Sequence, residues 1–267
     1  RLRKVSGKIM SAEVGTNKYE EVKTAPVIDL VFTSTKRSLI DRVSDVPLQF
    51  TRNTIGTYVD ANGIIQTAAA GEPRYTYDPA TGEELGLLVE ESRTNIALYS
   101  QEFNNGYWSK TGGGNPGTTV TANQAVAPDG TNTADFIDYT TAIFNSQNIE
   151  RSYDATPAGK TYTASVWING TSGQTINLTL DANGVNGSAE QFTLNGNWQR
   201  FSITRTYPAG SPDALFRFGT RNLGHPSAGT ATQIFAWGAQ IELGSFPTSY
   251  IPTTSGSTVS RDPDTVT

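Results

Sequence analysis

Apolar and polar residues alternate along much of this chain, in short runs separated by turn-forming residues. In the run 160–169 every second residue is aliphatic or aromatic, while the positions between carry hydroxyl groups and Trp167. A period of two places these two sets on opposite faces of a β-strand. The runs 174–181 and 197–207 alternate in the same way. The pattern therefore predicts strands with one buried face and one polar face.

Turn signals separate these runs at close intervals. Asn-Gly, the pair that supplies the positive φ values of a type I′ turn, occurs six times. The pairs begin at Asn62, Asn105, Asn169, Asn183, Asn186 and Asn195. Stretches rich in strong helix formers are scarce. We expect an all-β protein built from closely spaced hairpins, with less than about 10% helix.

The spacing of these elements predicts four sections. Residues 1–25 are charged and lack a clean period, so we expect an extended N-terminal arm that another chain must order. Residues 26–94 form a smaller β-rich section of short strands. Residues 95–251 carry longer strands at regular spacing, which predicts a jelly-roll β-sandwich. Residues 252–267 are expected to be a C-terminal tail.

Composition excludes several classes of function. The net charge is -5 and only 17% of the residues are charged, so we expect no nucleic-acid partner. No apolar run approaches the length of a membrane span, so we expect no membrane insertion. Cysteine is absent and His225 is the single histidine, which excludes thiolate catalysis and a multi-histidine metal site within one chain.

One predicted strand face combines an aromatic ring with hydroxyl groups, as sugar recognition requires. Trp167 lies on the hydroxyl-bearing face of its strand and could stack on a pyranose ring. The candidate hydrogen-bonding partners of that sugar are Asn177, Arg200, Asn148 and Glu150. The alternative is that Trp167 packs under a loop or against another subunit. Trp108 and Trp237 are expected in the core, the latter in an apolar row that runs through 235–243.

The pattern of acidic residues argues against hydrolysis. Glu83-Glu84 and Glu90-Glu91 are adjacent pairs, and neighbours on one strand point to opposite faces, so neither pair can flank a glycosidic bond. The chain also lacks the periodicity of a parallel β-helix, which counts against a tail-spike hydrolase. We expect a protein that is not an enzyme.

Several motifs resemble a family of tailed-phage virion proteins, over roughly residues 50 to 262. They are Phe50-Thr51-Arg52, Thr57-Tyr58-Val59-Asp60-Ala61-Asn62-Gly63, Pro73-Arg74, Tyr77-Asp78-Pro79, Gly86-Leu87-Leu88-Val89-Glu90-Glu91-Ser92-Arg93-Thr94-Asn95, Trp237-Gly238-Ala239-Gln240-Ile241-Glu242 and Phe246-Pro247-Thr248-Ser249-Tyr250-Ile251-Pro252. The middle section also resembles the jelly-roll carbohydrate-binding modules, through Asn95 to Ser100 followed by Phe103 and Trp108.

The virion resemblance implies a structural or host-recognition role, in a tail fibre or spike or in a capsid decoration. It implies a location on the virion exterior, other virion proteins as partners, a homo-oligomer with a trimer as one form, and a host-surface glycan as ligand. The alternative is a carbohydrate-binding module from a secreted bacterial enzyme that degrades polysaccharide.

The resemblance to carbohydrate-binding modules also implies a structural calcium ion near the first and last strands of the sandwich. Glu102 and Glu242 are the carboxylates available there. No other cofactor is expected.

Overall fold

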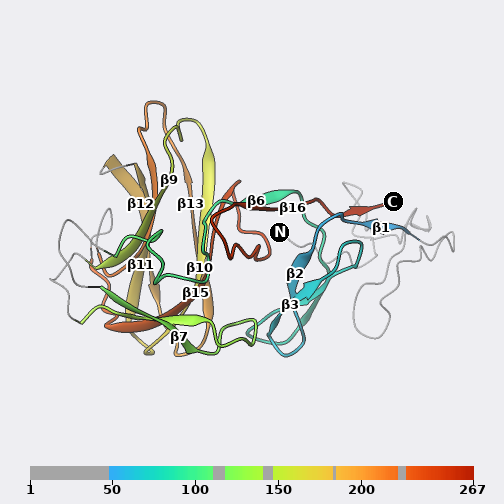
Figure 1. Ribbon diagram of the computed structural model, residues 1–267, viewed down its shortest axis with the longest axis horizontal. Coiled ribbons are helices and arrows are strands. Elements are labelled where there is room, and N and C mark those ends of the chain that lie inside the picture. Colours follow the sequence, from blue (N-terminus) through green and yellow to red (C-terminus); the bar gives the residue numbers. More distant parts are fainter. Residues whose placement is uncertain (1–47, 111–117, 141–146, 183–184, 222–226) are drawn as a thin grey trace, which may run out of the picture. The chain divides into compact units, whose positions relative to one another are not determined.

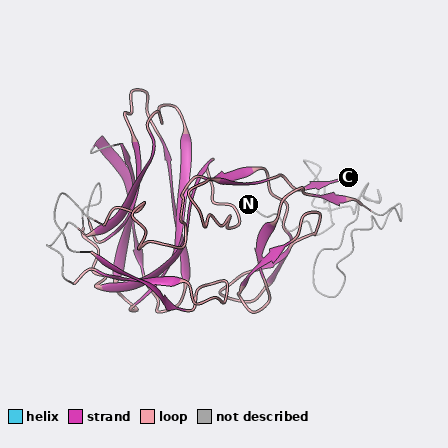
Figure 2. Ribbon diagram, viewed as in Figure 1, coloured by secondary structure: helices cyan, strands magenta, loops and turns pink. Residues whose placement is uncertain are grey.

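The computed structural model describes residues 48–110, 118–140, 147–182, 185–221 and 227–267. All regular structure in these ranges is β-strand, as Figure 2 shows, so the predicted all-β class is confirmed. The N-terminal arm, the start of the β-rich section and the single histidine lie outside the described residues. The chain forms two compact units: unit 1 contains the residues up to 91 together with 263–267, and unit 2 contains residues 92–262.

Unit 2 is a sandwich of two antiparallel sheets (Figure 1). The five-stranded sheet has the order β13 (Gln199–Thr206), β10 (Thr161–Gly170), β15 (Gln233–Leu243), β8 (Ala134–Asp138) and β7 (Thr119–Ala125). The four-stranded sheet has the order β12 (Val185–Thr193), β11 (Thr175–Ala182), β14 (Ala214–Gly219) and β9 (Asn148–Asp154). The chain crosses between the sheets at every connection from β8 to β15 except the one between β11 and β12, which is typical of a jelly roll.

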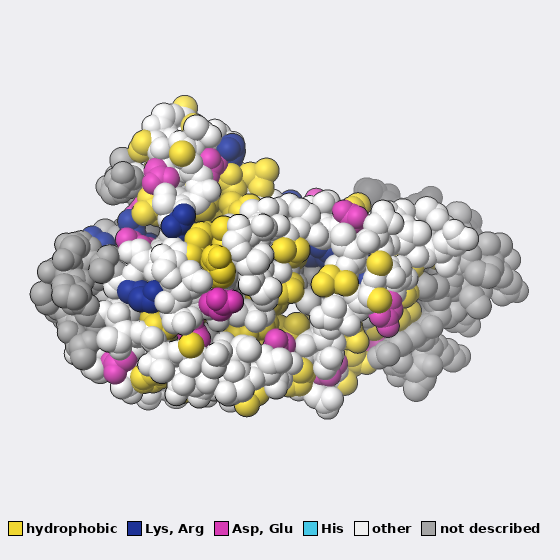
Figure 3. All heavy atoms as spheres, in the orientation of Figure 1, with side chains coloured by type: hydrophobic (Ala, Val, Ile, Leu, Met, Phe, Trp, Pro, Cys, Tyr) yellow, Lys and Arg dark blue, Asp and Glu magenta, His cyan; other side chains and the backbone are white. Residues whose placement is uncertain are grey.

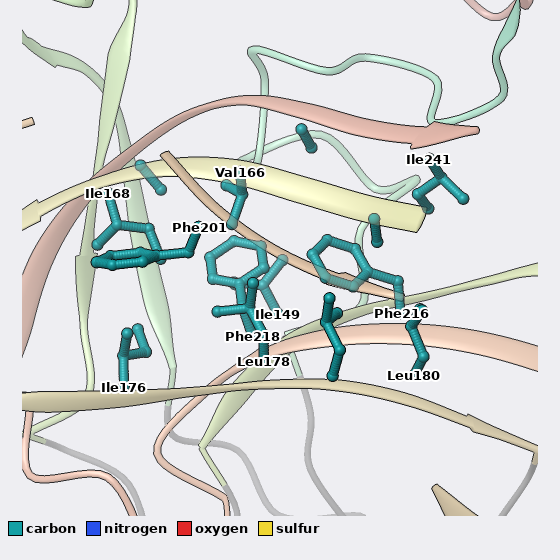
Figure 4. Packing of buried hydrophobic residues seen from close by; sticks show 14 of the residues in the cluster. Ile149, Val166, Ile168, Ile176, Leu178, Leu180, Phe201, Phe216, Phe218 and Ile241 are labelled. Carbon is teal, nitrogen blue, oxygen red and sulfur yellow. The ribbon is translucent and has the colours of Figure 1, made fainter. Parts of the chain in front are cut away.

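The inner faces of the two sheets form the main core of unit 2. Figure 4 shows Leu178, Phe216 and Phe218 of the four-stranded sheet meeting Val166 of the five-stranded sheet. These are the apolar positions that the period of two assigns to the buried face. At one end of the core, the rings of Trp108 and Phe103 pack with their centroids 5.2 Å apart. The indole of Trp108 is almost fully buried, as the sequence predicts.

A bulge interrupts the predicted apolar row of β15. Gly238 has a φ of +66°, and the register against β10 shifts at the same level. Before the bulge Trp237 points to the outer face, whereas after it Ile241 points into the sandwich. Trp237 is fully buried as expected, but it lies outside the main core cluster. Its ring packs against that of Tyr250, with the centroids 4.6 Å apart. A bulge changes the face of every later residue, which a strict period of two cannot represent.

A buried asparagine fixes the segment that follows β15. Asn95 ends β6 (Arg93–Asn95), which pairs with β16 (Val259–Arg261). Its amide nitrogen donates to the carbonyls of Ala239 at 3.1 Å and Ile251 at 2.8 Å. Its amide oxygen accepts from the backbone N–H groups of Ala97 and Ile241. All four bonds go to backbone groups, so this motif residue has a structural role.

Unit 1 consists of short strands. They are β1 (Phe50–Thr51), β2 (Gly56–Val59), β3 (Ile65–Ala68), β4 (Tyr75–Tyr77), β5 (Glu84–Leu87) and β17 (Thr265–Val266). β2 pairs with β3, β4 with β5, and β1 with β17 from the end of the sequence. The expected C-terminal tail is therefore divided between the units, with residues 252–262 in unit 2 and 263–267 in unit 1.

A buried cluster of charges holds unit 1 together. This ion cluster consists of Arg52, Arg74, Glu90 and Asp264. The carboxylate of Asp264 accepts from Arg52 Nη1 at 2.9 Å and from Arg74 Nη2 at 2.5 Å, and all three side chains are fully buried. Arg74 Nη1 also contacts Glu90 Oε2 at 2.8 Å. Arg52, Arg74 and Glu90 belong to three different motifs of the sequence, and the fold brings them together around Asp264.

Asp154 at the end of β9 leads to a prediction about acid stability. Burial alone would raise its pKa, but hydrogen bonds from Lys160, Thr156 and Tyr162 outweigh burial and lower the pKa to about 2. The carboxylate is thus more acidic in the folded state than in the unfolded chain, where its pKa is about 3.9. Its stabilisation is present above about pH 4 and is lost as the pH falls towards 2.

We therefore expect Asp154→Asn to lower the melting temperature at pH 7, with a difference from the parent that shrinks between pH 5 and pH 2. Thermal melts followed by circular dichroism across this range measure that difference. A difference that stays constant down to pH 2 would contradict the role assigned to Asp154.

Candidate functional site

The outer face of the four-stranded sheet carries polar side chains where the inner face is apolar. On β11, Ile176, Leu178 and Leu180 point into the core, and the residues between them point outward. Neighbouring strands add polar residues at the same level through their register. We call this surface the polar face, defined by Asn148, Glu150, Asn177, Asp181, Gln191 and Arg217.

Arg217 lies at the centre of the polar face and joins its two carboxylates. The register of β14 places it directly opposite Glu150 on β9. Arg217 Nε donates to Glu150 Oε2 at 2.6 Å, and its Nη1 contacts the carboxylate of Asp181. The Asn148 amide donates to the same oxygen of Glu150 at 2.8 Å. Charge-assisted bonds of this kind hold the side chains in fixed positions.

Two amides form the other half of the polar face. The Asn177 amide nitrogen donates to the carbonyls of Arg221 and Ser227, each at 3.0 Å. Gln191 Nε2 donates to Asn177 Oδ1 at 3.0 Å and to the carbonyl of Ala228 at 3.2 Å. These bonds attach the chain after β14 to the polar face. Asn177 is itself buried, whereas Gln191 is half-buried.

Two buried acceptors on this face lack a hydrogen-bond donor among the described residues, namely Asn148 Oδ1 and Asp181 Oδ1. Both oxygens are almost fully covered by the protein, so the side chains of this face that a ligand can reach are those of half-buried Glu150 and Gln191. Burial and the nearby charge of Arg217 lower the pKa of Arg221. Glu150 and Asp181 give the polar face two negative charges and Arg217 gives it one positive charge, and the neighbouring Arg221 brings the local sum to zero.

The structure divides the five predicted glycan-binding residues between the two sheets. Asn177, Asn148 and Glu150 lie together on the polar face of the four-stranded sheet. Trp167 and Arg200 lie on the outer face of the five-stranded sheet, where the two residues oppose each other in register. The expectation of one site built from all five residues is corrected here. Period-two sorting assigns a residue to a face of its own strand, but it does not say which sheet the strand joins.

Trp167 is packed against the chain itself. Its exposed fraction is 6%, and it opposes Trp237 in register. A Cβ atom added to Gly238 would lie 3.1 Å from Trp167 Cδ1 and 3.5 Å from Tyr250, so both rings close over this glycine. This is the packing alternative of the sequence analysis, and it leaves little of the ring face for stacking on a sugar.

Arg200 and Glu242 both bind the segment that follows β15. Arg200 Nη1 donates to the carbonyl of Thr248 at 2.7 Å, and Glu242 accepts from the backbone N–H and the hydroxyl of the same residue. Glu242 also accepts from Gln240 and lies 3.5 Å from Arg93 Nε. The buried carboxylate of Glu242 is therefore occupied by protein donors.

Glu102 acts electrostatically on Asp135, which pairs with Ala236 on β15. The expected calcium ion between Glu102 and Glu242 stays a prediction. Within the described ranges no group of three or more His, Asp or Glu side chains could hold a metal.

Sequence reasoning did not identify Arg217, Asp181 and Gln191 as site residues. Arg217 had a signal, because it is the one charged residue in the apolar run 214–218. Period-two alternation would have placed it on the face opposite Phe216 and Phe218. Alternation in the run 174–181 also places Asp181 on the outward face beside Asn177, but Asp181 was not singled out as a site residue.

Comparison with known proteins finds one family model that matches part of this chain. Residues 96–227 match the family model described as "Carbohydrate binding domain" (CBM_4_9). No curated protein shows significant sequence similarity to this chain. The match includes every residue of the polar face.

Solved structures with distant likeness include a xylan-binding domain from Paenibacillus barcinonensis, at 16% identity and a TM-score of 0.36, covering 58% of this chain and 94% of that one. A family 22 carbohydrate binding module from Clostridium thermocellum has 15% identity and a TM-score of 0.39, covering 59% and 97%. The enzymatically active domain of a Bacteriophage CBA120 tailspike protein has 16% identity and a TM-score of 0.42, covering 56% of this chain. The present chain spans 21% of that tailspike domain.

Two expectations about partners can be set beside the structure. The described ranges contain no helix that could cross a membrane. On the face of the molecule in Figure 3, Lys and Arg side chains of the described residues are interspersed with Asp and Glu. A cationic stripe of the kind that follows a nucleic-acid backbone is not visible on that face.

Proposed function

We propose that unit 2 binds a glycan without net charge through the polar face of its four-stranded sheet. The observation that carries this proposal is the network in which Arg217 and Asn148 hold the carboxylate of half-buried Glu150 in a fixed position. Fixed carboxylate and amide groups of this kind suit the hydroxyl groups of a sugar. The match of residues 96–227 to a carbohydrate binding domain supports the same assignment.

The proposed role is recognition without hydrolysis. Glu150 and Asp181 both contact one guanidinium instead of flanking an open space for a scissile bond. A glycosidase needs two carboxylates placed on either side of the bond that it cleaves. We expect the purified chain to release no reducing ends from polysaccharide.

We further propose that the chain is a structural component of a tailed-phage virion, exposed on the exterior and bound to other virion proteins. Support comes from the motifs that resemble virion proteins, since Arg52, Arg74 and Asn95 within them form the buried polar contacts of the two units. The alternative, a carbohydrate-binding module of a secreted bacterial enzyme, fits the family match about equally well.

The state of assembly separates these two roles. A virion component is expected to form a homo-oligomer or to attach to particles, and a free-standing module is expected to be a monomer. Light scattering of the full chain measures its oligomeric state. Electron microscopy of phage particles labelled with an antibody to this chain tests whether it is attached to them. Unlabelled particles together with a monomeric chain would contradict the virion role.

Glu150→Gln tests the polar face. The amide keeps the shape of the side chain but removes the charge that accepts from Arg217 and Asn148, so the face loses its fixed geometry. We expect about five- to thirty-fold weaker glycan binding, from the loss of a charge-assisted bond. The probe is an array of xylan, glucan and galactan oligosaccharides with bacterial lipopolysaccharides, followed by titration of the best ligand.

Glu190→Gln is the matched control. Glu190 lies on the neighbouring strand β12, is exposed and opposes Leu178, whose side chain points into the core. The same carboxylate-to-amide change on the other side of the sheet is expected to leave binding unchanged. Equal losses in both variants would show a general charge effect and contradict the assignment of the polar face.

A further inference from the structure

A row of aromatic side chains with one amide crosses the outer face of the five-stranded sheet. We call it the aromatic strip; it consists of Trp198, Asn169, Phe235 and Phe136, from four consecutive positions across the sheet. Asn169 opposes Phe235, and Phe235 opposes Phe136. Trp198 directly precedes Gln199, whose partner on β10 is the residue before Asn169. All four side chains are half-buried.

The strip lies on the outer face because its neighbours in sequence point inward. Ile168 and Ile234, which adjoin Asn169 and Phe235, belong to the core of the sandwich. The strip is also separate from the polar face, which lies on the other sheet. It is separate from Trp167 as well, which is two residues away on β10 and buried.

The aromatic rings of the strip are held in place. Trp198 Nε1 donates to the carbonyl of Val126 at 3.0 Å, and Val126 itself is 59% exposed. The indole is therefore anchored at the protein surface through its one polar group. Phe136 and Phe235 form a cross-strand pair with ring centroids 5.5 Å apart. Rings fixed in this way lose little side-chain entropy when a ligand stacks on them.

Polar groups lie between and beside these rings. The Asn169 amide sits between Trp198 and Phe235, and the described residues supply it with no hydrogen-bond partner. Gln233 and Asp138 are each two residues from Phe235 and Phe136, respectively, and oppose each other on the same face. Gln233 Nε2 donates to Asp138 Oδ2 at 3.1 Å. The strip thus has one amide among its three rings and an amide–carboxylate pair beside it, whereas a protein interface has an apolar centre with charged groups at its rim.

We propose that the aromatic strip is a second glycan-binding surface, which takes a chain of sugar rings laid across the strands. Sugar rings present C–H faces that stack on aromatic rings and hydroxyl groups that bond to amides and carboxylates. Four neighbouring strands span about 14 Å between the outer positions, which suits an oligosaccharide better than a single sugar. The inference rests on the proposed function in that the same chain must bind glycans.

Two binding surfaces on opposite sheets have a consequence for affinity. A polysaccharide long enough to reach both surfaces is held more tightly than either surface alone can hold it. Retention on long polysaccharide should therefore depend on both the polar face and the aromatic strip, and binding of a short oligosaccharide to the polar face should not depend on the strip.

The test uses the full chain with Asn169→Ala and Phe235→Ala, and Thr206→Ala as a control elsewhere on the same sheet face. Affinity electrophoresis in gels containing soluble xylan, β-glucan, galactan or lipopolysaccharide measures retention. We expect each strip variant to weaken retention about five-fold, the loss of one stacking or hydrogen-bonding contact, with the control unchanged. Light scattering on the same samples measures the oligomeric state.

Unchanged retention in both strip variants would overturn the inference, and a loss in Glu150→Gln alone would show that the proposed function still holds. A change in oligomeric state in place of weaker retention would also overturn it, because the strip would then be an interface between copies. Should Phe235→Ala fail to fold, Asn169→Ala decides the matter, since its amide bonds to none of the described residues. A parent chain retained by none of the polysaccharides would defeat both proposals.

Discussion

Asp264→Asn is expected to unfold unit 1 and leave unit 2 folded. The carboxylate of Asp264 accepts from both Arg52 and Arg74, and these side chains are fully buried. An asparagine would turn an N–H group towards one of the two guanidinium groups. Breaking a buried ion pair on one side costs about 3–5 kcal/mol, because the remaining charge is left without compensation.

Unit 1 has little else to offset such a loss. Its buried apolar side chains among the described residues are Ile65, Ala68 and Leu87. Limited proteolysis followed by mass spectrometry is the measurement, with new cleavage sites expected between residues 48 and 91. Glu83→Gln, which changes an exposed carboxylate of the same unit, is the control. A variant that resists cleavage as well as the parent does would show that the ion cluster is dispensable.

Trp167→Ala is expected to destabilise unit 2 strongly. The indole is buried beside Gly238 and opposite Trp237, so its removal leaves a cavity that the sheet cannot close. Large-to-small changes of this size cost about 3–5 kcal/mol. Chemical denaturation followed by the fluorescence of the remaining tryptophans measures the change in the free energy of unfolding.

Thr161→Ala on the same strand and the same face is the control. Its hydroxyl makes an exposed bond to Thr206, so the expected change in the free energy of unfolding is below about 1 kcal/mol. A stable Trp167→Ala variant with weakened glycan binding would restore the stacking role that the sequence first suggested. A loss of stability with glycan binding kept in the folded fraction would confirm packing.

The period of two was a sufficient guide to the sandwich. It assigned Ile176, Leu178 and Leu180 to one face of β11, and all three are buried in the core. It failed in β15, where the bulge at Gly238 reverses the face of later residues. A positive φ at glycine is a property of the folded backbone, and the alternation of residue types around it gives no warning.

Alternation along the strands predicted some residues of the candidate site, but it could not predict which strand faces other parts of the chain cover. Asn177 was selected because it lies on the polar face of its strand, and Asn148 and Glu150 were named only as hydrogen-bonding residues. All three lie on one sheet. Trp167 was selected on the same ground as Asn177, yet a later segment of the chain covers it. Which polar faces remain open depends on contacts between residues distant in sequence, as in the bond from Arg200 to Thr248, and alternation along one strand cannot report these.

The route of the chain through unit 1 has a consequence for the order of folding. Arg74 and Asp264 are separated by 190 residues, and closing a flexible loop of that length costs about 4–5 kcal/mol of entropy. Folding of unit 2 removes most of this cost, because it sets the entering strand β6 beside the leaving strand β16. On the ribosome, residues 48–91 are made early but lack their final strand until the last residues of this sequence emerge. Unit 1 is thus begun before unit 2 and completed after it.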